Sequence, residues 1–256
     1  MLRDLTRDDW LSILDLPERR IPKALILRGT RNLKSQYDLY RTHFSNIVEI
    51  GSPNGILEDV LVGDLDGLSV AYASVYGAPM ASEVVHIFGV LGTSLVVQTG
   101  CCGGLVDEIG PGDIFIATEA YCGEGASQYY KTDDKMVKAS VNVAESSAIR
   151  GINDVPVHFG RIYTTSALFA EGEREVEDWH SRGFSAVDME TSATFAVAEH
   201  FAMDRASILF AFDNPRRKEH ILMKEADKDK RRILGNKRMI ELGLGFVKEY
   251  NAAKSD

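Results

Sequence analysis

Short apolar runs alternate with amphipathic segments along most of the 256-residue chain. Runs bounded by Gly, Pro and polar residues predict strands, and apolar positions three and four residues apart predict helices. The expected strands cover residues 23–27, 47–50, 94–97, 113–118, 155–165, 185–187 and 205–212, with a hairpin over 58–75. The expected helices cover residues 32–43, 80–91, 133–149, 189–201 and 226–250, and residues 170–182 are expected to be partly helical.

Strands that alternate with helices over this length predict one α/β domain spanning residues 1–256. Residues 1–22 are charged and form an N-terminal extension, and residues 226–250 form a closing helix. The hairpin turns at Asp66-Gly67, a favoured two-residue turn. An antiparallel hairpin within an otherwise alternating pattern implies that the sheet is mixed.

The charge balance and the cysteines narrow the class of protein. A net charge of −9 argues against a nucleic-acid polymer as partner, because binding phosphates requires concentrated Lys and Arg. Three cysteines make no disulfide framework, and a cytoplasmic location fits them best. The polar start is unlike a secretory signal, and no apolar run approaches the roughly 20 residues that cross a bilayer. We therefore expect a protein that does not associate with membranes.

The segment from Gln98 to Asp113 reads QTGCCGGLVDEIGPGD and follows an expected strand. Gly100, Gly103 and Gly104 leave the backbone free of side chains, so that its N–H groups can approach a ligand closely. Open α/β sheets bind ligands where such turns follow strands. The segment is interpreted either as a ligand-binding loop or as a tight connection.

A second informative segment, Val187-Asp188-Met189-Glu190, lies where a buried strand meets a helix. Acidic residues at a helix start are stabilised by the helix dipole, so Asp188 and Glu190 can be caps. An ionised carboxylate also accepts hydrogen bonds from two vicinal hydroxyls. Both interpretations remain open for this pair.

The chain resembles a known family through four motifs in a fixed order. They are TGCCGGL (99–105), IGPGDI (109–114), AVDMETSATFAVA (186–198) and AFDN (211–214). The resemblance covers roughly residues 23–215 and is to the nucleoside phosphorylases, which include uridine phosphorylase, hexameric purine nucleoside phosphorylases and methylthioadenosine nucleosidases. It implies a three-layer α/β/α sandwich around a mixed, partly barrel-like sheet, the phosphorylase/hydrolase-like fold.

The resemblance also implies a site. Glu190 would hold the ribose hydroxyls with Asp188 beside it, Met189 would pack against the sugar, and Asp213 would protonate a purine leaving group. The glycine segment would line the pocket with Thr99, Gly100, Cys101, Cys102 and Gly103. Phe169, Glu173 and Arg174 would contact the base. The alternative interpretation is that Asp213 only forms a turn with Asn214 and Pro215, since Asp and Asn before Pro favour turns.

Phosphate would bind near Gly29, Thr30, Arg31, Gln98 and Cys101, but the family's arginines are missing. Gln98 and Leu33 stand at two of their positions, and residues 52–58, expected to come from a neighbouring subunit, contain none. Arg28, Arg31 or Arg41 could substitute. Residues 216–218 are interpreted as a solvated face and residues 228–232 as a helix surface.

The resemblance implies cleavage of the N-glycosidic bond of a nucleoside with phosphate as co-substrate, and no cofactor or metal. Because the arginines are missing, a nucleosidase that uses water and a non-catalytic nucleoside-binding protein are the alternatives. The resemblance further implies a homo-oligomer, from dimer to hexamer.

Overall fold

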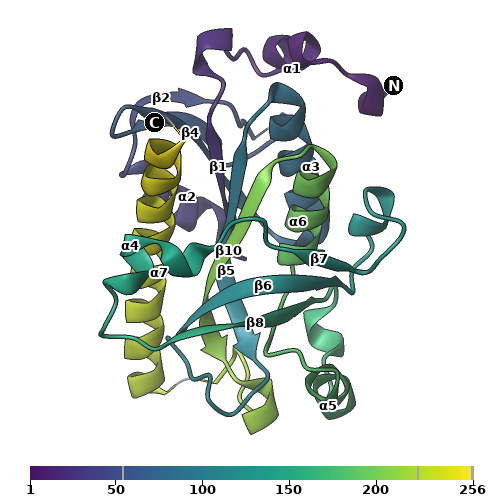
Figure 1. Ribbon diagram of the computed structural model, residues 1–256, viewed down its shortest axis with the longest axis vertical. Helices are drawn as coiled ribbons and strands as arrows, with labels where there is room; N and C mark the ends of the chain where they lie inside the picture. The colour runs from purple at the N-terminus through teal and green to yellow at the C-terminus, as the bar shows by residue number, and fades with distance from the viewer. Residues whose placement is uncertain (54, 224, 255–256) are drawn as a thin grey trace.

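The computed structural model describes residues 1–53, 55–223 and 225–254 (Figure 1). The strands are β1 (Ala24–Gly29), β2 (Ser45–Glu49), β3 (Val60–Leu65), β4 (Leu68–Val75), β5 (Leu95–Gly104), β6 (Ile114–Cys122), β7 (Met136–Lys138), β8 (Val157–Thr164), β9 (Ala186–Asp188) and β10 (Asp204–Asp213). The α-helices are α1 (Arg7–Ile13), α2 (Leu33–Arg41), α3 (Gly77–Leu91), α4 (Ser147–Arg150), α5 (Glu173–Ser181), α6 (Thr191–His200) and α7 (Ala226–Ala253). Short 3-10 turns are η1 (Leu2–Asp4), η2 (Glu18–Arg20), η3 (Ser127–Tyr129), η4 (Val143–Glu145), η5 (Leu168–Ala170) and η6 (Pro215–Arg217).

The strands join in one mixed sheet with the order β10-β6-β8-β9-β5-β1-β4-β3-β2. β10 also pairs in parallel with β5, so β5, β10, β6, β8 and β9 form a closed ring. The predicted hairpin is confirmed as β3 and β4, which turn at Asp66 and Gly67 with positive φ angles of 51° and 85°. The predicted mixed, partly barrel-like sheet is therefore confirmed.

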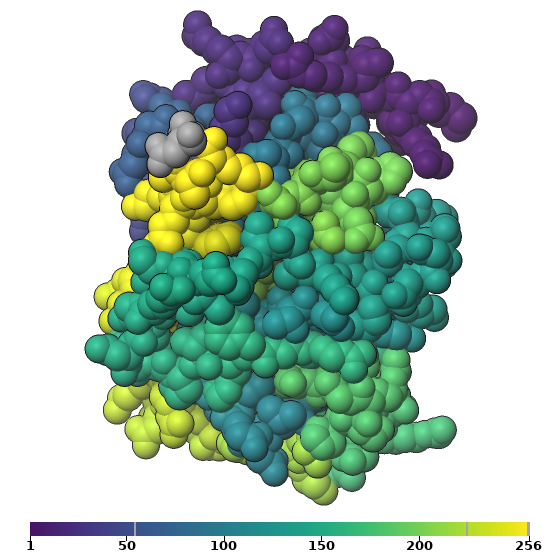
Figure 2. Space-filling model, viewed as in Figure 1, coloured from purple at the N-terminus to yellow at the C-terminus, as the bar shows by residue number. Residues whose placement is uncertain are grey.

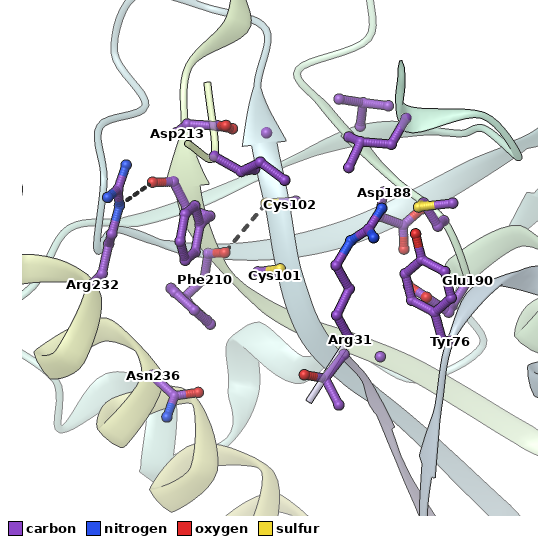
Figure 3. Close-up of a pocket in the computed structure, with 18 of the residues that line it drawn as sticks. Arg31, Tyr76, Cys101, Cys102, Asp188, Glu190, Phe210, Asp213, Arg232 and Asn236 are labelled. Atoms are coloured by element: carbon purple, nitrogen blue, oxygen red, sulfur yellow. Dashed lines mark hydrogen bonds between the residues drawn. The ribbon is translucent and has the colours of Figure 1, made fainter. Parts of the chain in front are cut away.

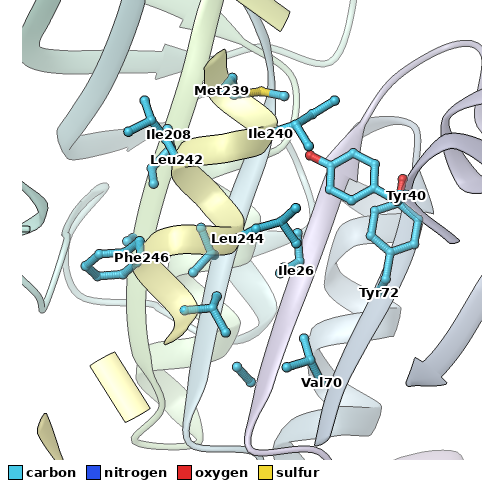
Figure 4. Close-up of a cluster of buried hydrophobic side chains, with 14 of the residues drawn as sticks. Ile26, Tyr40, Val70, Tyr72, Ile208, Met239, Ile240, Leu242, Leu244 and Phe246 are labelled. Atoms are coloured by element: carbon cyan, nitrogen blue, oxygen red, sulfur yellow. The ribbon is translucent and has the colours of Figure 1, made fainter. Parts of the chain in front are cut away.

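Helices cover both faces of the sheet, because alternate strand residues point to opposite sides. In β1, Ala24 and Ile26 pack toward α2 and α7, whereas Leu25 and Leu27 pack toward α3. Figure 4 shows the first of these clusters, in which Tyr40 of α2 stacks on Tyr72 at 4.3 Å and α7 crosses the strands. The central strands are buried on both faces, which explains their continuous apolar sequences.

The glycine segment differs from its prediction as a loop. Residues 98–104 continue β5, pairing with β10 along one edge and, at their two ends, with β1 and β9 along the other. The backbone there is extended because both edges are bonded to neighbouring strands. The glycines keep this strand narrow rather than making it flexible: a Cβ on Gly100 would lie 3.1 Å from the carbonyl oxygen of Gly29. Residues 98–104 are thus held in an extended strand rather than in a loop.

The helix predicted over residues 133–149 is wrong. This stretch contains β7, η4 and the single-turn helix α4. Asn142 and Ser146 accept hydrogen bonds from the backbone N–H groups of Ala144 and Ala148, both at 3.2 Å. Short polar side chains that bond to nearby backbone compete with helix formation. Val137 is buried by the pairing of β7 with β6, which favours the extended form.

Both termini lie at the same end of the molecule (Figure 1). Figure 2 shows the N-terminal residues covering one end of the molecule and α7 running along its side. Among the described residues, no helix is long and apolar enough to cross a membrane. Asn54, in the turn expected at 51–55, lies outside the described residues.

The contact between α7 and the chain before β6 yields a prediction about stability. A Cβ on Gly235 would collide with the backbone of Gly112. Gly235→Ala gains about 1 kcal/mol of helix propensity, but overpacking against a backbone that cannot rotate away costs about 1–3 kcal/mol. We expect denaturant unfolding to show a net loss of stability. Lys237→Ala, at an exposed position of the same helix, is the control. A more stable Gly235→Ala variant would contradict the close packing.

Candidate active site

A cavity of about 470 Å³ lies where the carboxyl ends of β1, β5, β9 and β10 meet α7. The residues that line it are Arg28, Gly29, Thr30, Arg31, Asn32, Gln36, Tyr76, Cys101, Cys102, Gly103, Leu168, Glu171, Val187, Asp188, Met189, Glu190, Phe210, Phe212, Asp213, Pro215, Ile221, Arg232, Ile233 and Asn236. Figure 3 shows Arg31, Tyr76 and Glu190 on one side, Asp213 and Arg232 on the other, and Cys101 between them.

Asp188 is a structural carboxylate. Its Oδ1 accepts a hydrogen bond from the Thr164 hydroxyl at 2.7 Å, and its Oδ2 accepts from the backbone N–H and the hydroxyl of Thr191 at 2.9 and 2.5 Å. These bonds join β8, β9 and the first turn of α6. Burial raises the pKa of Asp188, and the hydrogen bonds oppose that rise. Of the two carboxylates in the segment, Asp188 acts as the cap.

Glu190 occupies the N-cap position of α6, but its side chain makes no capping hydrogen bond and faces the cavity. Its Oε1 accepts a hydrogen bond from the backbone N–H of Gly77 at 2.7 Å. A Cβ on Gly29 would lie 2.6 Å from Oε2, so the carboxyl fits against β1 only because residue 29 has no side chain. Burial, and then the charge of Asp188, raise the pKa of Glu190 to about 8. The backbone of Met189 also bonds to the carboxyl, so the side chain is held in place and about two of its roughly four acceptor sites stay free.

Asp213 ends β10, and only 5% of its surface is exposed. A register shift between Ala211 and Asp213 interrupts the pairing with β5 just before it. Burial raises its pKa to about 7, while Arg232 opposes the rise. The turn that follows is held by Asn214, whose amide donates to the carbonyls of Val106 and Ile109 at 2.8 and 2.9 Å. Asn214 thus fixes the turn, and within the described structure no hydrogen bond holds the Asp213 carboxyl.

Sequence reasoning missed Glu171, a fourth carboxyl in the cavity. It follows η5 and is partly buried. Burial, and then the charge of Asp213, raise its pKa to about 7. The residues predicted nearby lie elsewhere: Glu173 and Arg174 are exposed, and Glu173 pairs with Lys218 at 2.8 Å. No local signal distinguishes Glu171 from these neighbours, since only the path of the chain turns it inward.

Some of the remaining residues that were expected to contact the base or phosphate line the cavity, and others do not. Phe169 is 82% exposed and lies outside the cavity lining. Cys101, Cys102 and Gly103 line the cavity, but Thr99 and Gly100 lie behind it. The Thr99 hydroxyl donates to the Leu27 carbonyl at 2.8 Å, and the Gly100 N–H donates to Met239 Sδ at 3.2 Å. Cys101 is exposed toward the cavity. Removal of its thiol from bulk water raises the thiol pKa to about 11, so the thiol is neutral.

The arginines that line the cavity are not at the positions where the family resemblance places them. Gln98, which stands at an expected arginine position, is fully buried and accepts a hydrogen bond from the Thr194 hydroxyl at 2.9 Å. Arg41 pairs with Glu49 at 2.8 Å and lies outside the cavity lining. Arg28 and Arg31 both line the cavity.

Arg232 corrects the prediction of a helix surface at 228–232, because it is only 6% exposed and lines the cavity. It donates to the Phe212 carbonyl at 2.7 Å and pairs with Asp229 at 2.8 Å. Residues 216–218 instead contact other surface groups. Within the described residues, no group of three or more His, Cys, Asp or Glu side chains could hold a metal ion.

Residues 46–248 match the model of the phosphorylase superfamily. The chain is 28% identical over 151 residues to the guanosine phosphorylase of Halorubrum lacusprofundi, covering 56% of this chain and 60% of that protein. It is 26% identical over 249 residues to a DeoD-type purine nucleoside phosphorylase of Buchnera aphidicola subsp. Schizaphis graminum, covering 84% and 97%. In structure it is similar to the uridine phosphorylase of Vibrio fischeri ES114, with a TM-score of 0.78, 21% identity and coverage of 92% and 95%.

The raised pKa values of the cavity carboxyls predict how stability depends on pH. The folded protein retains protons on Glu190, Asp213 and Glu171 that the unfolded chain releases at lower pH. Stability therefore falls as pH rises from the ordinary pKa values near 4 to the folded values of about 7 to 8. Asp213→Asn removes one such group, so its Tm should fall less than that of the wild type between about pH 5 and pH 8. Thermal unfolding with Asp227→Asn, an exposed control, measures this. Parallel curves for the wild type and Asp213→Asn would contradict it.

Proposed function

Because the chain belongs to the phosphorylase superfamily, we propose that it cleaves the N-glycosidic bond of a nucleoside and transfers the ribosyl group to phosphate. The bond from C1′ to the base nitrogen breaks, a bond from C1′ to a phosphate oxygen forms, and a proton goes to the departing base. The observation that carries the proposal is a single cavity in which Glu190 and Asp213 both present carboxyls that few protein groups bind.

Glu190 is the proposed ribose-binding residue. The Gly77 N–H holds Oε1, and the other oxygen is available to the 2′- and 3′-hydroxyls of a sugar. Hydrogen bonds donated by these hydroxyls favour the ionised carboxylate, offsetting the effect of burial on its pKa. Met189 also lines the cavity and offers an apolar surface to the sugar ring. The sugar would thus lie over the junction of β9 and α6.

Asp213 is the proposed general acid. With a pKa of about 7, a large fraction of its carboxyl carries a proton near neutral pH, which suits proton donation to a leaving group. A purine can accept that proton at N7, whereas a pyrimidine has no corresponding atom. The relatives named purine nucleoside phosphorylase and guanosine phosphorylase agree with this choice. We therefore propose a purine nucleoside as substrate.

A second candidate function is hydrolysis, with water as the nucleophile. Gln98 is buried against Thr194 and Leu33 is apolar, so two positions expected to hold cations for phosphate hold none. The finer properties follow from the family resemblance: we propose a cytoplasmic homo-oligomer that acts in nucleoside salvage without a cofactor.

A panel of purine and pyrimidine nucleosides, assayed with and without phosphate, tests the proposal. We expect free base and ribose 1-phosphate from purine nucleosides only when phosphate is present, with uridine cleaved more slowly. Free ribose formed without phosphate would favour hydrolysis. Nucleoside binding without any cleavage would identify a non-catalytic protein. Uridine cleavage that exceeds purine cleavage and survives Asp213→Asn would overturn the assignment of the base.

Glu190→Gln tests the ribose contact. The amide removes a charge-assisted interaction and presents a donor to the sugar hydroxyls; such interactions contribute about 1.5–3 kcal/mol. We expect kcat/KM to fall by roughly ten-fold to a hundred-fold or more, with no fall in Tm, because the amide also removes a carboxyl whose raised pKa lowers stability near neutral pH. Asp178→Asn, an exposed position on α5, is the matched control. A variant that unfolds readily yet keeps full activity would show that Glu190 has a structural role instead.

A further inference from the structure

Three side chains that line the cavity carry a buried polar atom with no hydrogen-bond partner among the described residues. These atoms are Arg28 Nε, Gln36 Oε1 and Arg232 Nη2. Buried polar atoms in folded proteins nearly always have a partner. Two of the three are guanidinium nitrogens, which only donate and which stay charged at every accessible pH. Gln36 Oε1 is an acceptor and does not favour an anion, whereas Arg28 and Arg232 place positive charge at the cavity wall.

Of the two arginines, Arg28 is the one that lacks a counter-charge in the described structure. It is only 4% exposed, and its two contacts are uncharged: Nη2 donates to Asn236 Oδ1 at 2.7 Å, and Nη1 donates to Met239 Sδ at 3.0 Å. Its guanidinium also lies 5.7 Å from the centre of the Phe210 ring. No carboxylate of the described chain lies within ion-pair distance of it, whereas Arg232 pairs with Asp229. A buried charge without a counter-charge is costly unless a ligand supplies one.

The pairing of β1 with β5 places Arg28 beside the residues that line the cavity. In the sheet, Arg28 pairs with Thr99 and Gly29 pairs with Gly100, which puts Arg28 next to the start of the glycine segment. Cys101, two residues further along β5, lines the same cavity, and Arg28 is the charge that most lowers its pKa against the effect of burial. Gln98 and Leu33 cannot supply a cation there.

Arg31 offers a second cation at the same wall. It lines the cavity and is exposed, and its guanidinium stacks over the rings of Tyr76 and Phe169 at 4.7 and 5.5 Å. No carboxylate within the described chain pairs with it. Figure 3 shows it extending between Cys101 and Tyr76.

We propose that Arg28, fixed in place by Asn236 and Met239 of α7, is the principal binding group for the phosphate dianion, with Arg31 as the second donor. The inference deepens the proposed function, on which it rests for the identity of the anion as the nucleophile. The binding groups come from β1, the residues that follow it and α7, all within one chain. In this proposal, two arginines at other positions take the place of the missing ones.

Phosphate binding to the wild type, Arg28→Gln, Arg28→Lys and Arg41→Gln tests this inference without requiring turnover. Titration calorimetry and the rise of Tm with orthophosphate, against chloride at matched ionic strength, are the readouts. We expect Arg28→Gln to weaken phosphate binding about ten-fold to a hundred-fold. Arg28→Lys should weaken it less, because it keeps the charge but loses the planar fork. Arg41→Gln, whose arginine pairs with Glu49 away from the cavity, should bind like the wild type.

Equal phosphate affinity in the wild type and Arg28→Gln, or no phosphate effect on the wild type beyond that of chloride, would overturn the inference. If Arg28→Gln does not fold, the same comparison is made with Arg28→Lys, where unchanged affinity and phosphate KM would overturn it. Parallel nucleoside assays separate the two proposals. Arg28-dependent phosphate binding without cleavage of any nucleoside would leave the anion site standing and remove the proposed function. Phosphorolysis with an unchanged phosphate KM in Arg28→Gln would leave the proposed function standing and remove Arg28 as the anion-binding residue.

Discussion

The hydrogen bonds of Asp188 are the interaction on which the rest of the site depends. They tie the end of β9 to Thr164 of β8 and to Thr191 of α6. With α6 fixed at its first turn, Glu190 has little freedom, and the Gly77 N–H orients its carboxyl toward β1. Asp188 thus uses three hydrogen bonds to hold the structure, whereas the Glu190 carboxyl two residues away faces the cavity.

The cavity keeps its acidic and basic groups apart. Arg28, Arg31 and Arg232 face the same space as Glu190 and Asp213, yet within the described residues no ion pair joins the two sets. Burial instead raises the pKa of both carboxyls. Had they paired with the arginines, the charges would have cancelled, and neither set would be free for a ligand. A nucleoside and an anion together can satisfy both sets of groups at once.

The fold was predictable from the sequence where local pattern decides it, as in the hairpin at Asp66-Gly67. The helix expected over residues 133–149 failed because pairing with β6 and local side-chain bonds outweighed its spacing of apolar residues. Within the site, Glu190 was a candidate because it follows a buried strand and Asp213 because of the family resemblance, and both line the cavity. The sequence could not show which of Asp188 and Glu190 is structural, because that depends on a hydrogen bond from Thr164, which lies 24 residues before Asp188 in the chain. Arg232 and Glu171 carry no local signal, because only the packing of α7 and the turn after η5 bring them to the cavity.

The closed ring of strands has a consequence for how the chain is made. β10 lies between β5 and β6, although it is the last strand to be synthesised. A nascent chain that ends before residue 204 leaves the edges of β5 and β6 unpaired, and unpaired edges invite association with other chains. Closure also brings together residues more than 100 positions apart, as in the pairing of Asp204 with Leu95. Such long-range pairing slows folding. The ring around the cavity therefore cannot close until β10 has been synthesised.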